Sequence, residues 1–330
     1  MMDVKRHVVS ADEAGMRLDR WFKLHFPQVT FAYLNKLTRT GQVRVGAARV
    51  KTSTRLEAAQ EIRVPPLAFD KRPADTPKAD VKPLSKEERR LFDSMVIHED
   101  KDIYVLNKPA GFAVQGGTKT HHHLDGLLMG LAAELGERPL LVHRLDRDTS
   151  GVIVIAKRRA VAAALGKLFA TRGVKKTYWA ATKGVPKPHQ GRIDVALIKA
   201  KGPEGDRVRA SAEGEEDDEQ RAVTNYAVID KASNLIAWVS LKPVTGRQHQ
   251  LRAHMAHIGT PIMGDEKYGG NVDMPEGVSK RLHLHARRIV FPHPRGGTID
   301  ISAPLPEHML QTWELFGFDP ARYDATGDGE

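Results

Sequence analysis

Apolar residues near the start of the chain follow the spacing of an amphipathic helix. A second helix is predicted over 31–40, because Thr30 can cap its start and Gly41 can end it. Alternating apolar and basic residues then predict short strands over 43–45 and 49–51. The apolar residues expected on the buried face of the first helix are Leu18, Trp21, Phe22 and Leu24.

The rest of the chain carries apolar runs of strand length and one predicted helix, over 250–256. None of the runs approaches the roughly 18–20 residues that cross a bilayer, so no membrane partner is expected. Residues 1–14 mix both charges and lack the apolar stretch of a signal peptide, which predicts a cytoplasmic protein. The predicted strands cover 103–106, 151–156, 177–182, 235–241 and 289–291.

Composition divides the chain into four parts. A small domain is expected over 1–66, and a linker over 67–90, where prolines stand among charged residues and large apolar side chains are few. A larger domain is expected over 91–318, followed by a tail over 319–330. Within the larger domain, the acidic run 213–219 is predicted to be a disordered loop, since it has no apolar partner residues.

The charge of the chain is positive and unevenly distributed. The 330 residues include 51 Lys and Arg against 41 Asp and Glu, a formal net charge of +10. Residues 1–66 hold twelve of the basic and six of the acidic residues, so more than half of the excess lies there. Such a balance favours a polyanionic partner, either nucleic acid or an anionic membrane surface. The chain has no cysteine, which excludes disulfides, zinc–thiolate sites and a thiol nucleophile.

One polar segment, 142–151, precedes the apolar run of a predicted buried strand. It places Asp146 between Arg144 and Arg147, whose charges favour the ionised carboxylate. An ionised carboxylate can act as a nucleophile. Local chemistry alone also fits a second interpretation, a turn in which Asp, Ser and Thr side chains cap their own backbone.

The order of residues in 142–151, Val-His-Arg-Leu-Asp-Arg-Asp-Thr-Ser-Gly, resembles the active-site motif of the RluA-type family of RNA pseudouridine synthases. The resemblance implies that Asp146 is the catalytic residue and that Asp148 only caps the turn. It also implies an α+β fold, with a long mixed, mostly antiparallel sheet in the catalytic domain. Further blocks that resemble the family are 104–111, 176–178, 244–252, 261–265, 268–269, 281–286 and 291–294.

The small domain resembles the αL RNA-binding module, which is similar to part of the small-subunit ribosomal protein S four. The segments that carry this likeness are 15–21, 37–41 and 43–45. It implies that the basic small domain binds RNA. The other interpretation is a solvated helical hairpin whose charges confer only solubility. The combination of the two domains looks most like the family members that modify large-subunit (23S) ribosomal RNA.

The resemblance also implies a pocket around Asp146. Arg252 is expected to bind the Asp146 carboxylate through two hydrogen bonds and to keep it ionised. Tyr178 is expected to stack on the displaced uracil, and Leu284 to line the pocket. Four cations are expected to contact phosphates nearby, namely Arg144, Arg147, Arg247 and Lys108.

Two positions depart from the family pattern. Gln248 stands where threonine is common and Gln115 where histidine is common, which concerns substrate detail and not the reaction class. The implied isomerisation has no redox step, so no cofactor is expected. No metal site is expected either, because His249, His254 and His257 do not share one helical face.

Three hypotheses follow. The first is a monomeric, cytoplasmic enzyme that isomerises specific uridines of large-subunit ribosomal RNA to pseudouridine. The second is a pseudouridine synthase for transfer RNA, since the small RNA-binding domain occurs in several branches of the family. The third is a non-catalytic RNA-binding or ribosome-assembly protein; such a protein would be expected to lack the nucleophile, and Asp146 is present.

Overall fold

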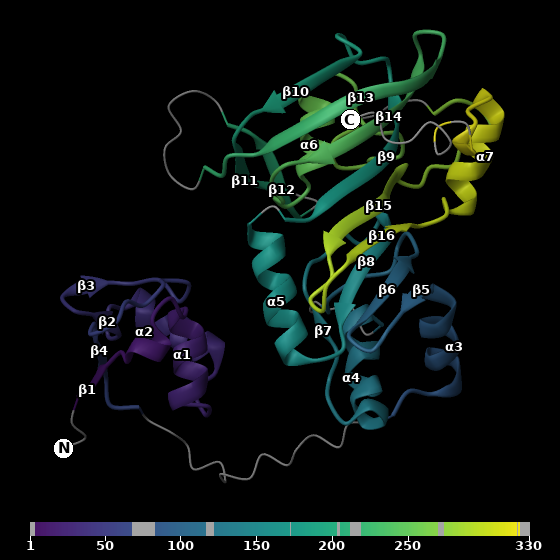
Figure 1. Ribbon diagram of the computed structural model, residues 1–330. Coiled ribbons are helices and arrows are strands. Elements are labelled where there is room, and N and C mark those ends of the chain that lie inside the picture. Colours follow the sequence, from purple (N-terminus) through teal and green to yellow (C-terminus); the bar gives the residue numbers. More distant parts are fainter. Residues whose placement is uncertain are drawn as a thin grey trace. The chain divides into compact units, whose positions relative to one another are not determined.

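Figure 1 shows the computed structural model of the chain. The structure describes residues 4–67, 83–116, 122–171, 173–202, 205–211, 219–269, 274–321 and 323. They belong to two compact units, Met1–Ala79 and Asp80–Glu330. In the described part of the chain, no helix has the length and apolar character needed to cross a membrane.

The small unit packs two helices against a four-stranded antiparallel sheet. Both predicted helices form, as α1 (Leu18–His25) and α2 (Phe31–Arg39), and the Thr30 side chain caps α2 by accepting a hydrogen bond from the Tyr33 backbone N–H. The strands, in the order in which they pair, are β1 (Lys5–Val8), β4 (Glu61–Val64), β2 (Arg44–Val45) and β3 (Ala48–Arg49). β2 and β3 form the predicted hairpin, whereas the sequence pattern does not predict β1 and β4.

One residue of the expected apolar face of α1 is not buried. Leu18, Trp21 and Phe22 lie in the core of the small unit, but Leu24 is 64% exposed. At 3.6 residues per turn, Leu24 points about 110° away from the mean direction of the other three. The prediction that Leu24 shares their face is therefore wrong.

The large unit is built on one long sheet (Figure 1). Its neighbouring strands are antiparallel, except that β8 and β15 are parallel. This arrangement confirms the expected α+β fold with a mostly antiparallel sheet. The strands, in order across the sheet, are β10 (Gln190–Asp194), β13 (Val223–Ala232), β14 (Ile236–Pro243), β9 (Lys175–Lys183), β15 (Leu284–Pro292), β8 (Ser150–Ala156), β6 (Ile103–Lys108) and β5 (Val96–Glu99), with β16 (Thr298–Ser302) on β15 and β7 (Leu140–Leu141) on β8.

Strand β8 is buried on both faces, which explains its continuous apolar run. Ile153 and Ile155 pack into one core cluster, and Val152 and Val154 pack into another on the opposite face. Two helices cover the first face and one covers the second. They are α3 (Lys86–Met95) and α4 (Leu124–Leu135) on the first, and α5 (Arg159–Ala170) on the second.

The other half of the sheet is covered by two more helices. Trp313 of α7 (Glu307–Phe316) packs edge-to-face on Trp238 of β14, and Trp238 packs on Trp179 of β9. The predicted helix over 250–256 is present as α6 (Gln250–His257) and packs on the opposite face of these strands.

Two predicted boundaries differ from the structure. The Ser85 side chain and Glu88 form a capping box that begins α3 at Lys86, so the last part of the expected linker 67–90 is helical. In the expected tail, the ring of Tyr323 packs against Trp179. Residues 68–82 and 324–330, and all of the acidic run 213–219 except Glu219, lie outside the described residues.

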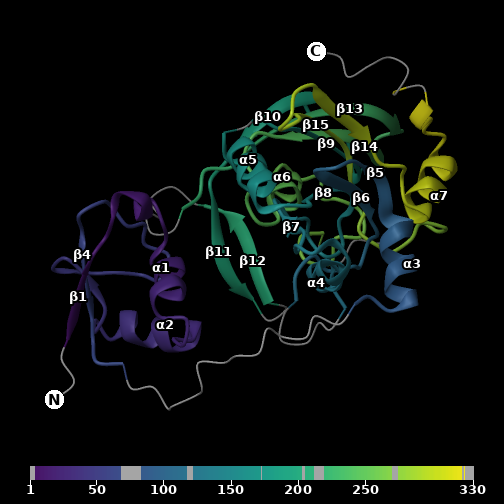
Figure 2. The ribbon, with the colours of Figure 1, turned by 60° about the horizontal axis from the view of Figure 1, so that its bottom comes forward.

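A β-hairpin stands apart from the long sheet (Figure 2). It consists of β11 (Leu197–Gly202) and β12 (Gly205–Ala210). Leu197 and Val208 are buried against Ala253 of α6, so this hairpin is anchored next to that helix. α6 follows directly after the segment 244–249, which lines a cavity of the large unit.

Candidate active site

The polar segment 142–149 forms a loop that runs from β7 into β8. Leu145 is buried and anchors the loop in the core. The His143 ring stacks on Phe169 at a centroid distance of 4.5 Å, and its Nε2 accepts a hydrogen bond from the Val154 backbone N–H at 2.9 Å. Burial lowers the pKa of His143 to about 3, so the imidazole is neutral and serves as an acceptor. Asp146 comes directly after these two anchored residues.

Where the loop enters β8, two backbones come very close together. Gly151 has φ +108°, and a Cβ atom there would lie 2.2 Å from the Ala286 carbonyl oxygen of β15. Only glycine fits this position. The adjacent Ser150 hydroxyl bonds to Nδ1 of His285 at 2.9 Å, while Nε2 of His285 faces the Ala303 carbonyl. The Thr-Ser-Gly end of the motif therefore joins β8 to β15 and fixes the loop that carries Asp146.

Lys108 is fully buried, at 0% exposure, and does not reach solvent. Its Nζ donates hydrogen bonds to the carbonyl oxygens of Pro109, Phe112 and Arg147, each at 2.9 Å. Burial lowers the pKa of Lys108 to about 7. The prediction that Lys108 contacts a phosphate is therefore wrong, because the side chain instead holds the carbonyl next to Asp146.

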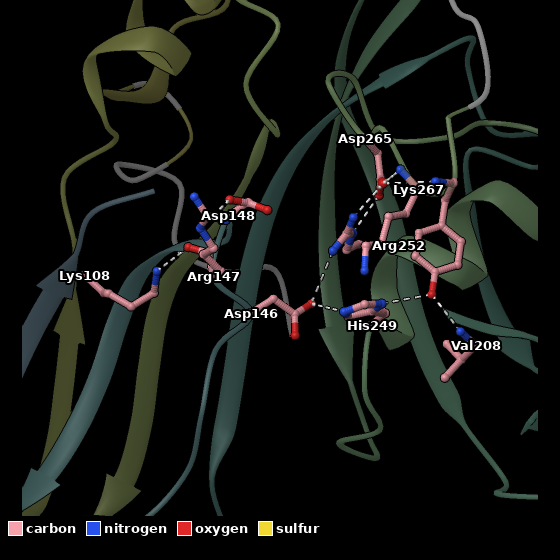
Figure 3. A network of polar contacts seen from close by, with 10 residues as sticks. Lys108, Asp146, Arg147, Asp148, Val208, His249, Arg252, Asp265 and Lys267 are labelled. Atoms are coloured by element: carbon pink, nitrogen blue, oxygen red, sulfur yellow. Dashed lines mark hydrogen bonds and ion pairs between the residues drawn. The ribbon is translucent and has the colours of Figure 1, made fainter. Parts of the chain in front are cut away.

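The Asp146 carboxylate faces nitrogen atoms of two side chains (Figure 3). Its Oδ2 lies 3.9 Å from Nε2 of His249 and 3.8 Å from Nη1 of Arg252. The Asp146 side chain is 21% exposed, whereas those of His249 and Arg252 are 10% and 6% exposed. The Asp146 carboxylate is thus partly accessible to solvent, while the two side chains that face it are largely buried.

Arg252 is held by a different carboxylate from the one expected. Its Nε and Nη2 donate to the two oxygens of Asp265, both at 2.7 Å, and the Asp265 side chain is 0% exposed. The predicted pairing of Arg252 with Asp146 is present as an ion pair at 3.8 Å, but the two hydrogen bonds expected there are made to Asp265 instead. The physical reason is that Asp265 lies deeper, where a desolvated charge pair needs full hydrogen bonding.

The Asp146 side chain lines a cavity of about 580 Å³. Tyr178 on β9 and Leu284 on β15 line it, as expected from the sequence. Burial, with a smaller contribution from the Asp146 charge, raises the pKa of Tyr178, so its phenol is neutral. Lys176 also lines the cavity, and burial lowers its pKa.

Of the other three residues expected to contact phosphates, two line the cavity and one lies outside its lining. Arg144 and Arg247 line the cavity and are exposed, and Nε of Arg247 donates to the Arg221 carbonyl. Arg147 lies outside the lining, 73% exposed, with Nε 3.9 Å from Asp148. Of the two departures from the family pattern, Gln248 lines the cavity and Gln115 does not.

Three residues of the site are not identified by sequence reasoning. His249 is considered there only as a metal ligand, and the structure places it beside Asp146 instead. Asp265 and Tyr268 complete the contacts of Arg252 and His249. The signal that could have found Asp265 and Tyr268 is their position in the blocks 261–265 and 268–269, which follow the Arg252 block in the sequence.

A different group of side chains has the spacing of a metal site. Among the described residues, Asp100, Asp102 and His293 bring their potential ligand atoms within 4.8 Å of one another. Asp102 is paired with both Arg158 and Arg295, which lower the pKa of its carboxyl. Two guanidinium groups already balance its charge, which disfavours an added cation.

Comparison with known proteins agrees with the geometry. Residues 102–257, which include Asp146 and Arg252, match the family described as RNA pseudouridylate synthase. Among curated proteins, ribosomal large subunit pseudouridine synthase C of Escherichia coli (strain K12) is 35% identical over 316 residues, which cover 93% of this chain and 94% of that protein. The corresponding protein of Haemophilus influenzae is 34% identical and covers 93% of each chain.

A solved structure is similar to this chain over much of its length. Human RNA pseudouridylate synthase domain containing 4 superposes with a TM-score of 0.59 and 28% sequence identity, covering 70% of this chain and 97% of that one. The fold and the cavity define a synthase built around one long sheet with an aspartate loop at its centre. The chain belongs to the RNA pseudouridylate synthase family, whose members are isomerases that act on RNA.

Proposed function

We propose that this protein converts specific uridines of large-subunit ribosomal RNA to pseudouridine, with Asp146 as the catalytic residue. The observation that carries the proposal is the position of Asp146. Its carboxylate is partly exposed in a cavity whose wall contains Tyr178 and Leu284, and it faces Arg252 and His249. This is the setting needed for a carboxylate that acts on a base displaced from its stack.

The main requirement of the reaction is a carboxylate held next to the sugar and base of the target uridine. The N1–C1′ bond of uridine breaks, the uracil turns, and a C5–C1′ bond forms; the C5 proton is lost and N1 gains a proton. Positive character develops on the sugar as the first bond breaks. A carboxylate beside the anomeric carbon can stabilise that charge or trap it covalently, as in retaining glycosidases. Because no group enters or leaves overall, the proposed chemistry uses only the side chains of this chain.

The cavity wall suits a flat base. Tyr178 presents an aromatic ring on which uracil can stack, and Leu284 supplies an apolar contact. Arg144 and Arg247 are exposed at the same cavity and can contact the phosphates that flank the target nucleotide. Each of these roles follows from the residue type and from its place in the cavity lining.

Large-subunit ribosomal RNA is the substrate proposed on the basis of the curated relatives, which are named for it and match over most of both chains.

The small unit adds an RNA-binding surface. It has a groove lined by Arg17, Arg20, Lys23 and Arg55, with the exposed ring of Phe31 beside them. Basic side chains next to an aromatic ring suit single-stranded RNA. We place this activity in a monomeric protein of the cytoplasm, where the substrate is found.

The test compares wild-type protein with Asp146→Asn on transcripts of large-subunit ribosomal RNA and of transfer RNA. Wild type is expected to form pseudouridine in the ribosomal transcript alone, and Asp146→Asn is expected to form none while still binding RNA. Asp148→Asn is the matched control, because Asp148 is exposed and lies two residues away, and it is expected to keep activity. Pseudouridine formation by Asp146→Asn would overturn the catalytic assignment. Pseudouridine formation in the transfer RNA transcript alone would overturn the proposal that ribosomal RNA is the substrate.

A further inference from the structure

Tyr268 connects the surroundings of Asp146 to the β11–β12 hairpin. Its hydroxyl oxygen lies 2.9 Å from the backbone nitrogen of Val208 on β12 and 3.0 Å from Nδ1 of His249. The other ring nitrogen of His249, Nε2, lies 3.9 Å from the Asp146 carboxylate. Figure 3 shows His249 between Asp146 and the Val208 side of this chain of contacts.

The direction of the first of these hydrogen bonds follows from its donor. The backbone N–H of Val208 can only donate, so the Tyr268 oxygen is its acceptor. Within the described part of the chain, the second hydrogen bond of this hydroxyl is the one to Nδ1 of His249. We assign the single phenolic proton to that bond, with Nδ1 as the acceptor. A neutral His249 that accepts at Nδ1 carries its own proton on Nε2, the nitrogen nearest Asp146.

We propose that Tyr268 is a positioning residue that holds His249 neutral and directs its Nε2–H at the Asp146 carboxylate. The proposal rests on the function proposed above for Asp146. A neutral N–H donor orients a carboxylate without adding a second full positive charge beside it. Arg252 already supplies one charge at 3.8 Å, and a second would hold the carboxylate in an ion pair and weaken it as a nucleophile.

Tyr268 is itself fixed on several sides. Its backbone N–H donates to Asp265 at 3.1 Å, and the Arg252 guanidinium lies 5.2 Å from the centre of its ring. Its ring meets that of His249 edge-on, at 5.7 Å and 87°. The residue thus supports both side chains that face Asp146.

The backbone of His249 is also in an uncommon state. Its φ of +50° lies in the left-handed region, where residues other than glycine are uncommon, at the cap position before α6. The turn is held by Gln250, whose side-chain oxygen accepts from the Arg247 backbone N–H at 3.0 Å. This conformation brings the imidazole to the cavity side of the helix start, and backbone strain of this kind is frequent at functional sites.

Several charges act on His249, and burial is the largest influence. Burial lowers its pKa, Asp146 and Asp265 raise it, and Arg252 and Lys267 lower it. A phenol that donates to Nδ1 adds to the lowering, because the site for the second proton is occupied. The groups that face His249 are Asp146, Arg252, Asp265, Lys267 and Tyr268.

The first test uses wild-type protein and nitrogen NMR of labelled histidine side chains, with His249→Asn to assign the resonance. The expected spectrum at neutral pH shows His249 neutral, with the proton on Nε2 and an unprotonated Nδ1. A His249 that carries its proton on Nδ1, or that is doubly protonated at neutral pH, would overturn the proposal. This measurement does not depend on activity, so it is distinct from the Asp146→Asn test of the proposed function.

The second test removes only the hydroxyl. In Tyr268→Phe, Nδ1 of His249 is free to take a proton, so the pKa of His249 rises and the acid limb of kcat/KM moves to higher pH by about half to one unit. Tyr226→Phe is the matched control, since the Tyr226 hydroxyl donates to the Pro188 carbonyl and does not line the cavity. Its acid limb is expected to stay in place. An unchanged acid limb in folded Tyr268→Phe contradicts the proposal, and if this variant does not fold, the wild-type spectrum decides.

Discussion

The Arg252 guanidinium binds Asp265 through two of its nitrogens and faces Asp146 with the third. The two contacts to Asp265 are 2.7 Å long, whereas the approach to Asp146 is 3.8 Å. Asp265 therefore fixes the position of the Arg252 guanidinium, and the Asp146 oxygens stay available for a substrate. Arg252 therefore has two roles. Its pair with Asp265 stabilises the structure of the site, and its positive charge acts on the Asp146 carboxylate.

Asp265→Asn is expected to destabilise the protein by about 3 kcal/mol, because it leaves the Arg252 charge buried without its partner. The free energy of unfolding in urea measures this change. Asp300→Asn is the matched control, since it breaks an exposed pair with Arg288 and is expected to cost less than about 1 kcal/mol. Equal losses in the two variants would show that burial of the Arg252 pair does not matter.

Lys108 predicts a specific dependence of stability on pH. Its pKa is about 7 in the folded protein against an ordinary value of 10.5, so between these values the unfolded chain binds more protons. The folded state must charge a buried lysine below pH 7, and this cost is relieved as the pH rises. The free energy of unfolding therefore gains up to about 1.4 kcal/mol per pH unit from this residue between about pH 7 and 10.5.

Lys108→Met is the variant that checks this contribution. Its unfolding free energy, followed in denaturant from pH 7 to 10, is expected to rise less with pH than that of wild type. The exposed Lys183, changed to Met, serves as the control and is expected to keep the wild-type slope. If Lys108→Met also keeps that slope, the buried lysine is not neutral in the folded protein at high pH.

Gly151→Ala is expected to lose at least about 2 kcal/mol of stability and nearly all activity, because the new Cβ collides with the Ala286 carbonyl where β8 pairs with β15. Thermal unfolding and pseudouridine formation measure the two effects. Gly166→Ala is the control within the same unit. That glycine lies in α5, and among the described residues no atom beyond its own helix backbone and chain neighbours lies within 4 Å of an added Cβ. This change is therefore expected to stabilise the helix by up to about 1 kcal/mol.

The groove of the small unit predicts a change in the salt dependence of RNA binding. If Arg20 and Lys23 each neutralise a phosphate, replacing both with Gln reduces the slope of log K against log salt by about 1.4 to 1.8. Binding titrations at several salt concentrations give this slope. Replacing the exposed Lys183 and Lys231 with Gln provides a charge-matched control, for which we expect the wild-type slope.

Much of the fold can be predicted from local patterns. The strand of continuous apolar residues that became β8 and the helix capped by Thr30 are both present. Their signals lie within a few adjacent residues, and periodicity and capping depend on short-range geometry. β1 and β4 lack such a signal, because each is short and gains its stability from pairing with the other across more than fifty residues of chain.

The sequence by itself determined the family resemblance, the α+β class and Asp146 as the candidate catalytic residue, because ten adjacent residues carry that motif. It also indicated Tyr178 and Leu284, which line the same cavity. Only the tertiary structure decided which charges are paired. Lys108 is buried against the loop of Asp146, and Arg252 binds Asp265, because the partner of a polar side chain depends on which distant segments pack beside it and on how much water that packing removes.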